Sequence, residues 1–319
     1  MPIRIAVLDD YQSAAQSSAD WTPLRDRADV TFFTDHVADP ADLVRRLESF
    51  EVVVAMRERT AFPASILDRL PNLALLVTTG PFNAAIDVAA AHARGIVVCG
   101  TGSVPHTTAE LTWALIMAVT RRVAAEDAAL RAGRWQTTIG PELAGSTLGI
   151  LGLGNIGARI ARYAQAFDMD VVAWSENLTS ERAEAVGVKL VSKQELFERA
   201  DVATVHLKLS ERTTNLIGRP ELELLGPRGY LVNTSRGPIV DEYALAAALS
   251  EGVIAGAALD VFSVEPLPAD HPLRLAPNTV LTPHIGYVSE PMYQRFFGDA
   301  VEDIVSWLQG TPVRVISAG

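Results

Sequence analysis

The sequence predicts an α/β protein built from two doubly wound parallel sheets. Short apolar runs that suit buried strands alternate with helical segments through the first hundred residues, and the alternation resumes from residue 147 to about 285. Strands that alternate with helices favour a parallel sheet with helices on both faces. The 319 residues are enough for two such domains, and a glycine-rich strand–turn–helix unit opens the second series.

The first series predicts five strands and has no glycine-rich phosphate loop. Helices are expected over residues 40–47, with Asp39 as the N-cap, and over residues 63–70. We interpret this series as the domain that binds substrate groups. The strands are expected at residues 3–8, 30–33, 52–56, 73–78 and 96–99.

A turn-rich joint at residues 100–105 leads into the second series. Thr107 or Thr108 is suited to cap a helix from residue 109 to about 131, which we interpret as a scaffold between the domains. A final amphipathic helix over residues 287–309 is expected to return and pack on the first domain. Strands are expected near residues 148–151, 170–174, 202–207, 229–233, 254–259 and 279–282. We therefore assign residues 1–102 and 288–319 to a substrate domain, and residues 103–287 to a dinucleotide-binding domain.

The glycines that open the second series have the spacing of a dinucleotide-binding turn. In such a turn, Gly152 permits the tight bend, Gly154 lets a phosphate approach the backbone, and Gly157 lets the helix pack close to the strand. The N-terminus of that helix then attracts a pyrophosphate. Glu176 follows the next strand, about 20 residues after the last glycine. A purely structural turn is the alternative.

Composition and charge disfavour several classes of protein. The formal net charge of −11, without a cluster of Lys and Arg, argues against nucleic acid or an anionic membrane as a partner. Cys99 is the only cysteine, which excludes an internal disulfide and fits a reducing, cytoplasmic setting. No spacing typical of metal ligands is present, so no metal is expected. The N-terminus is unlike a signal peptide, and the apolar stretch 111–119 is too short to span a bilayer.

Ligands bind at the carboxyl ends of the strands of an open parallel sheet. The guanidinium of Arg236 suits bidentate binding of a carboxylate, and Gly237 permits a turn that directs it outward. A surface ion pair of Arg236 with an acid such as Asp241 is the alternative. The polar residues that follow the predicted strands of the second series are His206, Ser235, Arg236, Asp260, Glu265 and His284.

His284 follows the last predicted strand, and imidazole is the side chain that most readily exchanges a proton near neutral pH. Glu265 can accept the other ring N–H and orient the imidazole. A proton donor, an orienting carboxylate and an anion-binding arginine beside a dinucleotide site describe the reduction of a carbonyl next to a carboxylate. A structural histidine is the alternative for His284. We interpret the histidines at positions 36, 92, 106 and 271 as structural or solvated.

Four motifs resemble those of the D-isomer-specific 2-hydroxyacid dehydrogenase family, in the family's order and over nearly the whole chain. They are Gly-Leu-Gly-Asn-Ile-Gly at 152–157, Asn-Thr-Ser-Arg-Gly at 233–237, Ala-Leu-Asp-Val-Phe at 258–262 with Glu-Pro-Leu at 265–267, and Thr-Pro-His-Ile-Gly at 282–286. The resemblance implies two Rossmann-like domains, the first flavodoxin-like, with the active site in a cleft between them. It also implies an NAD(P)-dependent enzyme that interconverts a 2-keto acid and a D-2-hydroxy acid, usually as a homodimer formed through the nucleotide domains.

The resemblance further implies a role for individual residues. Arg236 would bind and orient the 2-keto acid, His284 would donate the proton to the carbonyl oxygen, and Glu265 would hold His284 protonated. Asp260 would bind the nicotinamide carboxamide. The other implied cofactor contacts are Gly152, Gly154, Gly157, the backbone amides of Asn155 and Ile156, and Ser175, Glu176, His206 and Thr234.

One departure from the family pattern concerns the cofactor. Ser175 occupies the position where NAD-dependent members usually have Asp, and Glu176 follows it. Serine tolerates a 2′-phosphate, whereas the carboxylate of Glu176 repels one. We therefore expect NAD, with NADP possible.

A second departure concerns the substrate. The first-domain loop that commonly reads Gly-Val-Gly-Val-Asp is Gly-Pro-Phe-Asn-Ala at residues 80–84, and Pro81 has no N–H to offer a carboxylate. Gly80, the amide of Phe82 and the side chain of Asn83 are then the expected substrate contacts. The sequence does not identify the 2-hydroxy acid. A nucleotide-sensing binding protein of the same fold, similar to transcriptional corepressors, is the alternative to an enzyme.

Overall fold

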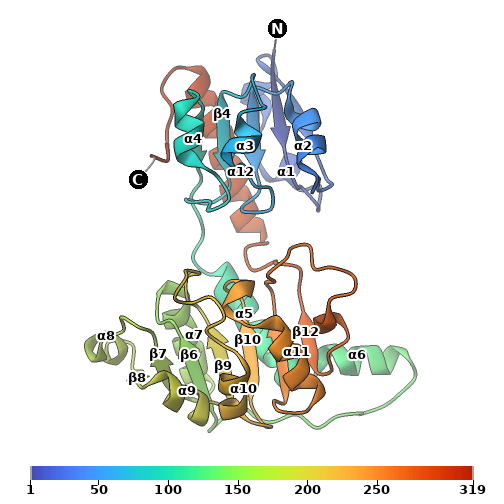
Figure 1. Ribbon diagram of the computed structural model, residues 1–319, viewed down its shortest axis with the longest axis vertical. Coiled ribbons are helices and arrows are strands. Elements are labelled where there is room, and N and C mark those ends of the chain that lie inside the picture. Colours follow the sequence, from blue (N-terminus) through green and yellow to red (C-terminus); the bar gives the residue numbers. More distant parts are fainter. Residues whose placement is uncertain (1, 318–319) are drawn as a thin grey trace. The chain divides into compact units, whose positions relative to one another are not determined.

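A computed structural model describes residues 2–317 of the chain. Two compact units are present: Met1–Val104 with Val288–Gly319, and Pro105–Tyr287. Each contains one parallel sheet with interleaved helices (Figure 1), so the predicted α/β class is confirmed. In the part of the chain that the structure describes, no helix is long and apolar enough to cross a membrane.

The sheet of the first unit has five strands in the order β2-β1-β3-β4-β5. This is the flavodoxin-like order, in which the chain reverses direction of travel between β1 and β3. Strands β3 and β4 are buried along their whole length, which explains why they form continuous apolar runs. The strands are β1 (Ile3–Val7), β2 (Ala28–Phe32), β3 (Val52–Ala55), β4 (Leu75–Thr78) and β5 (Val97–Gly100).

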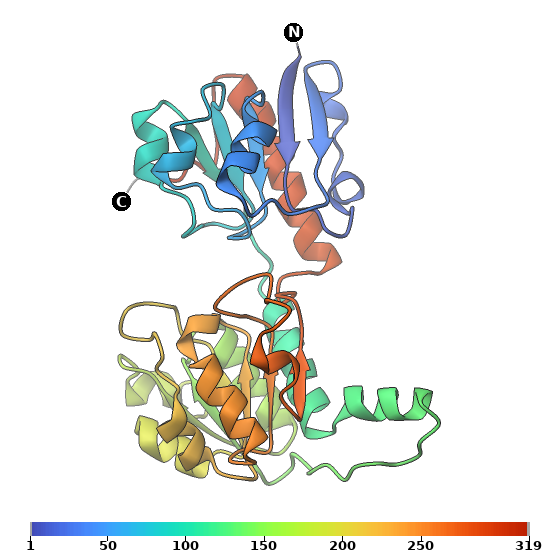
Figure 2. The same cartoon turned by 45° about the vertical axis from the view of Figure 1, so that its right-hand side comes forward.

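Short helices connect these strands, and one long helix from the end of the chain completes the unit. Asp39 caps α2 (Pro40–Leu47) as predicted, because its side chain accepts hydrogen bonds from the N–H groups of Ala41 and Asp42. Helix α12 (Glu290–Leu308) packs on β4 and α1 in this unit (Figure 2). It begins later than predicted because Ser289 is its N-cap and Pro291 stands in its first turn. The others are α1 (Ala15–Ser18), η1 (Thr22–Leu24), α3 (Ala64–Leu67) and α4 (Val88–Ala93).

The sheet of the second unit has seven strands in the order β12-β11-β10-β9-β6-β7-β8. Strand β6 pairs with β7 on one side and with β9 on the other, so the strand order reverses at β6. This is the dinucleotide-binding order, and its switch point between β6 and β9 is where ligands bind. The strands are β6 (Thr147–Leu151), β7 (Asp170–Trp174), β8 (Lys189–Leu190), β9 (Val202–Val205), β10 (Tyr230–Asn233), β11 (Gly256–Leu259) and β12 (Thr279–Leu281).

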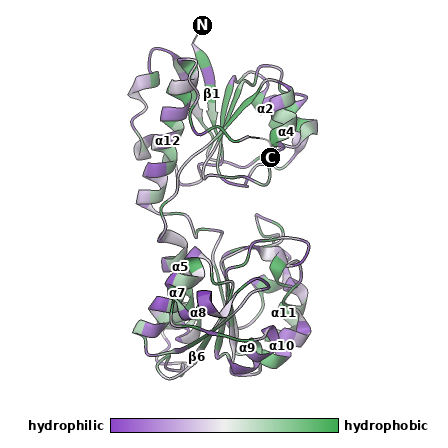
Figure 3. Ribbon diagram, turned by 90° about the vertical axis from the view of Figure 1, so that its left-hand side faces the viewer, coloured by the Kyte–Doolittle hydropathy of each residue, from purple (hydrophilic) through white to green (hydrophobic). Residues whose placement is uncertain are grey.

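Helices cover both faces of this sheet, and each face has its own apolar core. The strands that form the centre of the unit are mainly hydrophobic, whereas the outer helices carry hydrophilic residues (Figure 3). The helices are α5 (Thr107–Thr120), α6 (Val123–Arg131), α7 (Asn155–Ala166), α8 (Ser180–Glu184), α9 (Lys193–Arg199), α10 (Arg219–Leu225), η2 (Gly237–Ile239), α11 (Glu242–Ser250) and η3 (Pro272–Arg274).

The single helix predicted from residue 109 to about 131 is wrong. The structure divides it into α5 and α6, because Arg122 adopts a left-handed conformation with φ of +52° between them. Its guanidinium donates a hydrogen bond to the side chain of Asn278. The predicted cap also differs: Thr107 is the first helical residue of α5, and the N-cap is His106 without a side-chain hydrogen bond.

Candidate active site

The glycine turn after β6 has the close contacts that its sequence predicts. Gly152 has φ of +98°, and a Cβ at this position would lie 2.6 Å from the carbonyl oxygen of His206. A Cβ on Gly157 would lie 2.2 Å from the Gly152 carbonyl oxygen, so only glycine lets α7 approach the strand this closely. By contrast, a Cβ on Gly154 would meet no heavy atom within 4 Å. The backbone at the start of α7 is therefore open to a ligand.

The end of β7 lies beside the same turn. The Gly152 N–H donates a 2.8 Å hydrogen bond to the Trp174 carbonyl, which places Ser175 and Glu176 next to the glycines. Ser175 is half-buried and Glu176 is exposed. Asn155 and Ile156 begin α7, whose first turn holds no acidic residue that would repel a phosphate.

His206 follows β9, on the other side of the switch point. Its backbone N–H donates a 2.7 Å hydrogen bond to the Leu151 carbonyl, and its ring Nε2 lies 3.0 Å from the Thr204 hydroxyl. Burial lowers the pKa of His206 to about 3, so the imidazole is neutral at neutral pH. His206 is therefore an uncharged polar residue beside the glycine turn, and its contact with a cofactor stays a prediction.

Thr234 is held by α5. Its hydroxyl lies 2.7 Å from the Thr112 hydroxyl, which itself donates a hydrogen bond to the Thr108 carbonyl. Because Thr112 uses its only proton there, Thr234 is the donor in the pair. The Thr234 side chain is 6% exposed, and its proton is used within the protein.

Arg236 stands in a turn that Asn233 organises. The Asn233 side-chain amide donates to the Arg236 carbonyl at 2.9 Å, and its oxygen accepts from the Ser235 N–H at 3.0 Å. A Cβ on Gly237 would lie 2.0 Å from the backbone of Phe262, so glycine allows this turn to pack directly on the segment after β11. That segment leads to Glu265.

His284 and Glu265 are brought together as predicted. His284 Nδ1 lies 2.6 Å from Glu265 Oε2, while Glu265 Oε1 accepts a 2.8 Å hydrogen bond from the Phe262 N–H. A carboxylate partner means that Nδ1 carries the proton, which leaves Nε2 as the second ring nitrogen for exchange. The two side chains are 23% and 33% exposed, so the pair remains open to a small ligand. The ring also packs edge-to-face on Tyr287, with centroids 5.5 Å apart.

Asp260 shapes the loop that carries His284. Its Oδ1 accepts hydrogen bonds from the Thr282 hydroxyl at 2.6 Å and the Ile285 N–H at 2.8 Å, and its Oδ2 accepts from the Gly286 N–H at 2.7 Å. Burial raises the pKa of Asp260, and these hydrogen bonds oppose that effect. His284 has φ of +53°, so the loop depends on these contacts to hold an uncommon backbone conformation. The carboxamide contact expected of Asp260 stays a prediction.

In the first unit, the loop after β4 has a well-defined shape. Gly80 has φ of +94°, and its N–H donates a 2.6 Å hydrogen bond to the Thr101 hydroxyl. Asn83 is 8% exposed, and its amide donates to the Arg57 carbonyl at 2.6 Å while its oxygen accepts from the Ala85 N–H. Its side chain therefore holds the loop together. Phe82 is 75% exposed.

Arg57 is a residue that the sequence analysis missed. It follows β3 with φ of +51°, and its Nη1 would lie 1.8 Å from a Cβ on Gly80, so glycine there makes room for the guanidinium. Nη1 also donates to the Thr79 carbonyl at 3.3 Å, and the guanidinium lies 3.5 Å from the Glu58 carboxylate. The sequence contains a signal for it, because Arg57 stands just after the predicted strand at residues 52–56.

Comparison with known proteins decides the family. The family described as D-isomer specific 2-hydroxyacid dehydrogenase, NAD binding domain, matches residues 113–286, which include the glycine turn, Arg236, Glu265 and His284. The chain belongs to this family. It is therefore an NAD(P)-dependent oxidoreductase that acts on 2-hydroxy acids or the corresponding 2-keto acids.

Proteins that are named for different substrates are similar to this dehydrogenase in sequence or in structure. A glyoxylate reductase from Aeropyrum pernix is 40% identical over 77% of this chain and 76% of its own length. A D-3-phosphoglycerate dehydrogenase from Archaeoglobus fulgidus is 37% identical over 86% of this chain, which spans only 52% of that relative. The crystal structure of a phosphoglycerate oxidoreductase from Vibrio cholerae O395 has a TM-score of 0.91 and 36% identity, and covers 97% of this chain and 99% of that chain.

The residues of this dehydrogenase fit a nicotinamide dinucleotide. The open backbone at Gly154, the N-terminus of the twelve-residue helix α7 and the neutral His206 lie at one switch point. Ser175 and Glu176 lie at the end of β7, where the adenosine ribose is held in this type of fold. In residues 2–317 no group of three or more His, Cys, Asp or Glu is arranged to hold a metal ion.

The shifted pKa of His206 predicts a stability effect. The folded state favours neutral His206 down to about pH 3, whereas the unfolded chain binds a proton below about pH 6.5. The contribution of neutral His206 to the free energy of unfolding is therefore complete above pH 6.5. It is lost progressively as the pH falls from 6.5 towards 3. His206→Gln should reduce the loss of unfolding free energy between pH 6.5 and 4.5 by at most about 1.4 kcal/mol per pH unit. Urea unfolding of both proteins without nucleotide, at several pH values, measures this effect. If the unfolding free energies of wild type and His206→Gln fall in parallel, the expectation is wrong.

Proposed function

We propose that this dehydrogenase reduces a 2-keto acid to the D-2-hydroxy acid, and catalyses the reverse reaction, with His284 as the acid–base group. The 2.6 Å contact between His284 Nδ1 and Glu265 Oε2 is the observation that supports this most. The carboxylate accepts from Nδ1 and orients the ring, and in the proposed reaction Nε2 donates a proton to the carbonyl oxygen. The bound nicotinamide supplies the hydride.

Arg236 is the proposed partner of the substrate carboxylate. Its planar guanidinium can bind both carboxylate oxygens, and the Asn233 turn keeps the backbone at residues 236–237 close to the segment that leads to Glu265. A bound carboxylate fixes the orientation of the neighbouring carbonyl, which contributes to the rate because the reacting atoms are held in place.

NAD is the proposed cofactor in preference to NADP. Glu176 is exposed at the end of β7, where its negative charge would repel a 2′-phosphate. The N–H groups of Asn155 and Ile156 at the start of α7 are proposed to bind the pyrophosphate. Asp260 and Thr234 are proposed as further contacts of the nicotinamide end.

The loop after β4, with Gly80, Phe82 and Asn83, is proposed to line the substrate site. Gly80 and the Asn83 side chain bond within the unit and hold the shape of the loop, so Phe82 is the proposed direct contact. The large exposed ring of Phe82 would limit the size of the acid, and Arg57 adds a positive charge beside Gly80. A positive charge at this position suits a substrate with an anionic substituent. The acids named in the relatives differ in that substituent: 3-phosphoglycerate carries a phosphate, whereas glyoxylate has none.

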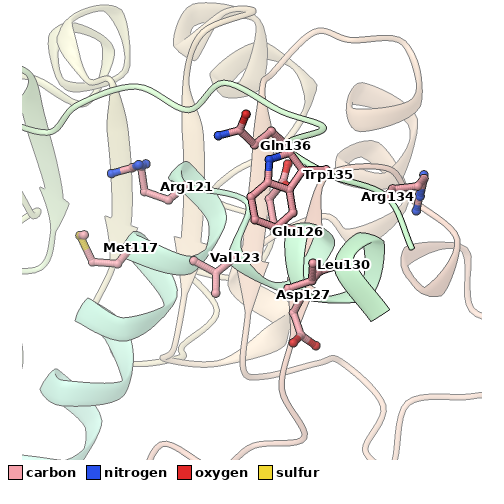
Figure 4. A pocket seen from close by; sticks show the side chains of 9 residues that line it. All are labelled: Met117, Arg121, Val123, Glu126, Asp127, Leu130, Arg134, Trp135 and Gln136. Carbon is pink, nitrogen blue, oxygen red and sulfur yellow. The ribbon is translucent and has the colours of Figure 1, made fainter. Parts of the chain in front are cut away.

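A homodimer is proposed, formed by the arm of the second unit that comprises α6 and the segment after it. Trp135 is 76% exposed and Ile139 is 99% exposed, and Trp135 lines a hollow together with Val123 and Leu130 (Figure 4). Exposed apolar groups of this size mark interaction sites, and a second copy can bury the same patch on both partners. A cytoplasmic location is proposed from the single buried cysteine, Cys99.

Oxidation of NADH and of NADPH with a panel of 2-keto acids tests the function. We expect turnover of glyoxylate or hydroxypyruvate with a preference for NADH, and weaker turnover of phenylpyruvate. The panel should include phosphorylated hydroxypyruvate, which tests Arg57. Arg57→Gln should lower kcat/KM for this substrate about tenfold and leave kcat/KM for glyoxylate unchanged. Tight nucleotide binding without turnover of any acid would contradict the enzyme and favour a nucleotide sensor.

A further inference from the structure

We propose that a buried pair, Glu242 and His271, positions Glu265 and through it the acid–base histidine. The inference rests on the roles proposed above for Glu265 and His284. Glu242 lies in the first turn of α11 and is 6% exposed. Its Oε1 accepts a 2.6 Å hydrogen bond from the Ser263 N–H, and its Oε2 lies 3.3 Å from His271 Nε2.

The hydrogen bonds of His271 define its tautomer. His271 is the N-cap of η3, and its Nδ1 accepts a 3.4 Å hydrogen bond from the Leu273 N–H. Nδ1 is therefore the acceptor nitrogen of the ring, which leaves the Nε2–H facing Glu242 Oε2 at 3.3 Å. The imidazole thus lies against one oxygen of a buried carboxylate, and the other oxygen accepts from the Ser263 N–H. Burial and the N-cap bond agree with the structural role predicted for His271, and the positioning of Glu242 is the further role proposed here.

The Gly237 turn packs against the start of the segment that Glu242 holds, but residues 263–266 themselves are exposed, Val264 to 59%. Burial of these four residues therefore does not fix where Glu265 lies. Besides the 2.6 Å contact with His284, two hydrogen bonds hold this part of the chain: Glu265 Oε1 accepts from the Phe262 N–H, and Glu242 accepts from the next N–H, that of Ser263. The first bond lies within the segment, whereas the second connects it to a helix.

Helix α11 is a firm support for this connection. Leu245, Ala248 and Leu249 are buried in the core, and Asp241 caps the helix through the N–H groups of Tyr243 and Ala244. Glu242 therefore anchors the exposed segment to a firmly packed helix. A displacement of about 1 Å at a reacting group can cost a large factor in rate, so a positioning residue here affects catalysis without touching the substrate.

Three variants test the pair in the full-length protein. Glu242→Gln offers one acceptor oxygen for two donors, and His271→Leu removes the donor to Glu242. Both should lower kcat about tenfold, less than loss of the acid itself, while the NADH dissociation constant stays within about twofold. His271→Gln keeps an N–H that can reach Glu242 and should retain most of the activity.

A matched control is Glu221→Gln in α10. Glu221 also accepts a backbone N–H, that of Gly218, and pairs with Lys193 at 2.8 Å, but it makes no bond to residues 262–265. It should lower the unfolding temperature as much as Glu242→Gln without changing kcat.

A spectroscopic readout separates this inference from the proposed function. The Nδ1 signal of His284 in ¹⁵N-histidine-labelled protein, assigned with His284→Asn, should shift in Glu242→Gln and His271→Leu and stay unchanged in Glu221→Gln. If the unfolding temperature falls but both kcat and this signal match wild type, the pair is only structural and the inference is wrong. An inactive wild type would contradict the proposed function, while the His284 signal would still test the pair.

Discussion

Replacing His284 by alanine is expected to lower kcat for reduction of the 2-keto acid about 10²–10⁴-fold, which is the contribution typical of a general acid. The substitution removes Nε2, the proposed proton donor, and leaves Glu265 without the 2.6 Å partner that it orients. The glycine turn is unaffected, so the NADH dissociation constant should be nearly that of wild type. Steady-state kinetics and an NADH fluorescence titration measure the two quantities.

Two further variants show whether the effect belongs to the site. Glu265→Gln keeps a hydrogen-bond partner for His284 but removes the charge, so its kcat should lie between those of wild type and His284→Ala. His92 is exposed on α4 of the first unit, and His92→Ala should have wild-type kinetics. Unchanged turnover in His284→Ala would remove His284 from the mechanism, whatever the reaction.

Local patterns predicted much of this fold because they depend on neighbouring residues. The buried strands of both units are mainly apolar runs, and the caps and glycines lie next to the elements that they begin or end. Asp39 is an example, since its partners are two and three residues away. The break at Arg122 was not predictable in this way. A left-handed arginine is stabilised by contacts such as that with Asn278, which is distant in sequence.

The site was predictable in composition but not in its internal connections. The pairing of His284 with Glu265 follows from two motifs with known chemistry. The bonds of Asp260 to Ile285 and Gly286, and those of Glu242 to Ser263 and His271, join segments that are 21 to 29 residues apart. No propensity or spacing specifies such contacts, because they depend on how the strands and loops pack.

The second large effect is expected at the glycine turn, where two alanine substitutions should have opposite consequences. A Cβ on Gly157 would lie 2.2 Å from the Gly152 carbonyl oxygen, a backbone atom that cannot move without separating α7 from β6. Gly157→Ala should therefore destabilise the protein by about 3 kcal/mol or more. A Cβ on Gly154 meets no heavy atom within 4 Å, and its φ of −85° suits alanine, so Gly154→Ala should change the free energy of unfolding by less than about 1 kcal/mol.

Gly154→Ala, the variant expected to be stable, should be the one that loses nucleotide affinity. In Gly154→Ala the new methyl group occupies the space through which a phosphate approaches the start of α7, so the NADH dissociation constant should rise at least about tenfold although the fold is intact. Thermal unfolding and an NADH titration on the same preparations give both values. Wild-type affinity in a stable Gly154→Ala would mean that no phosphate lies against this turn, and the open backbone at Gly154 would then need another explanation. A stable, well-packed Gly157→Ala would mean instead that α7 can move away from β6, because the contact at 2.2 Å leaves no other way to accommodate the methyl group.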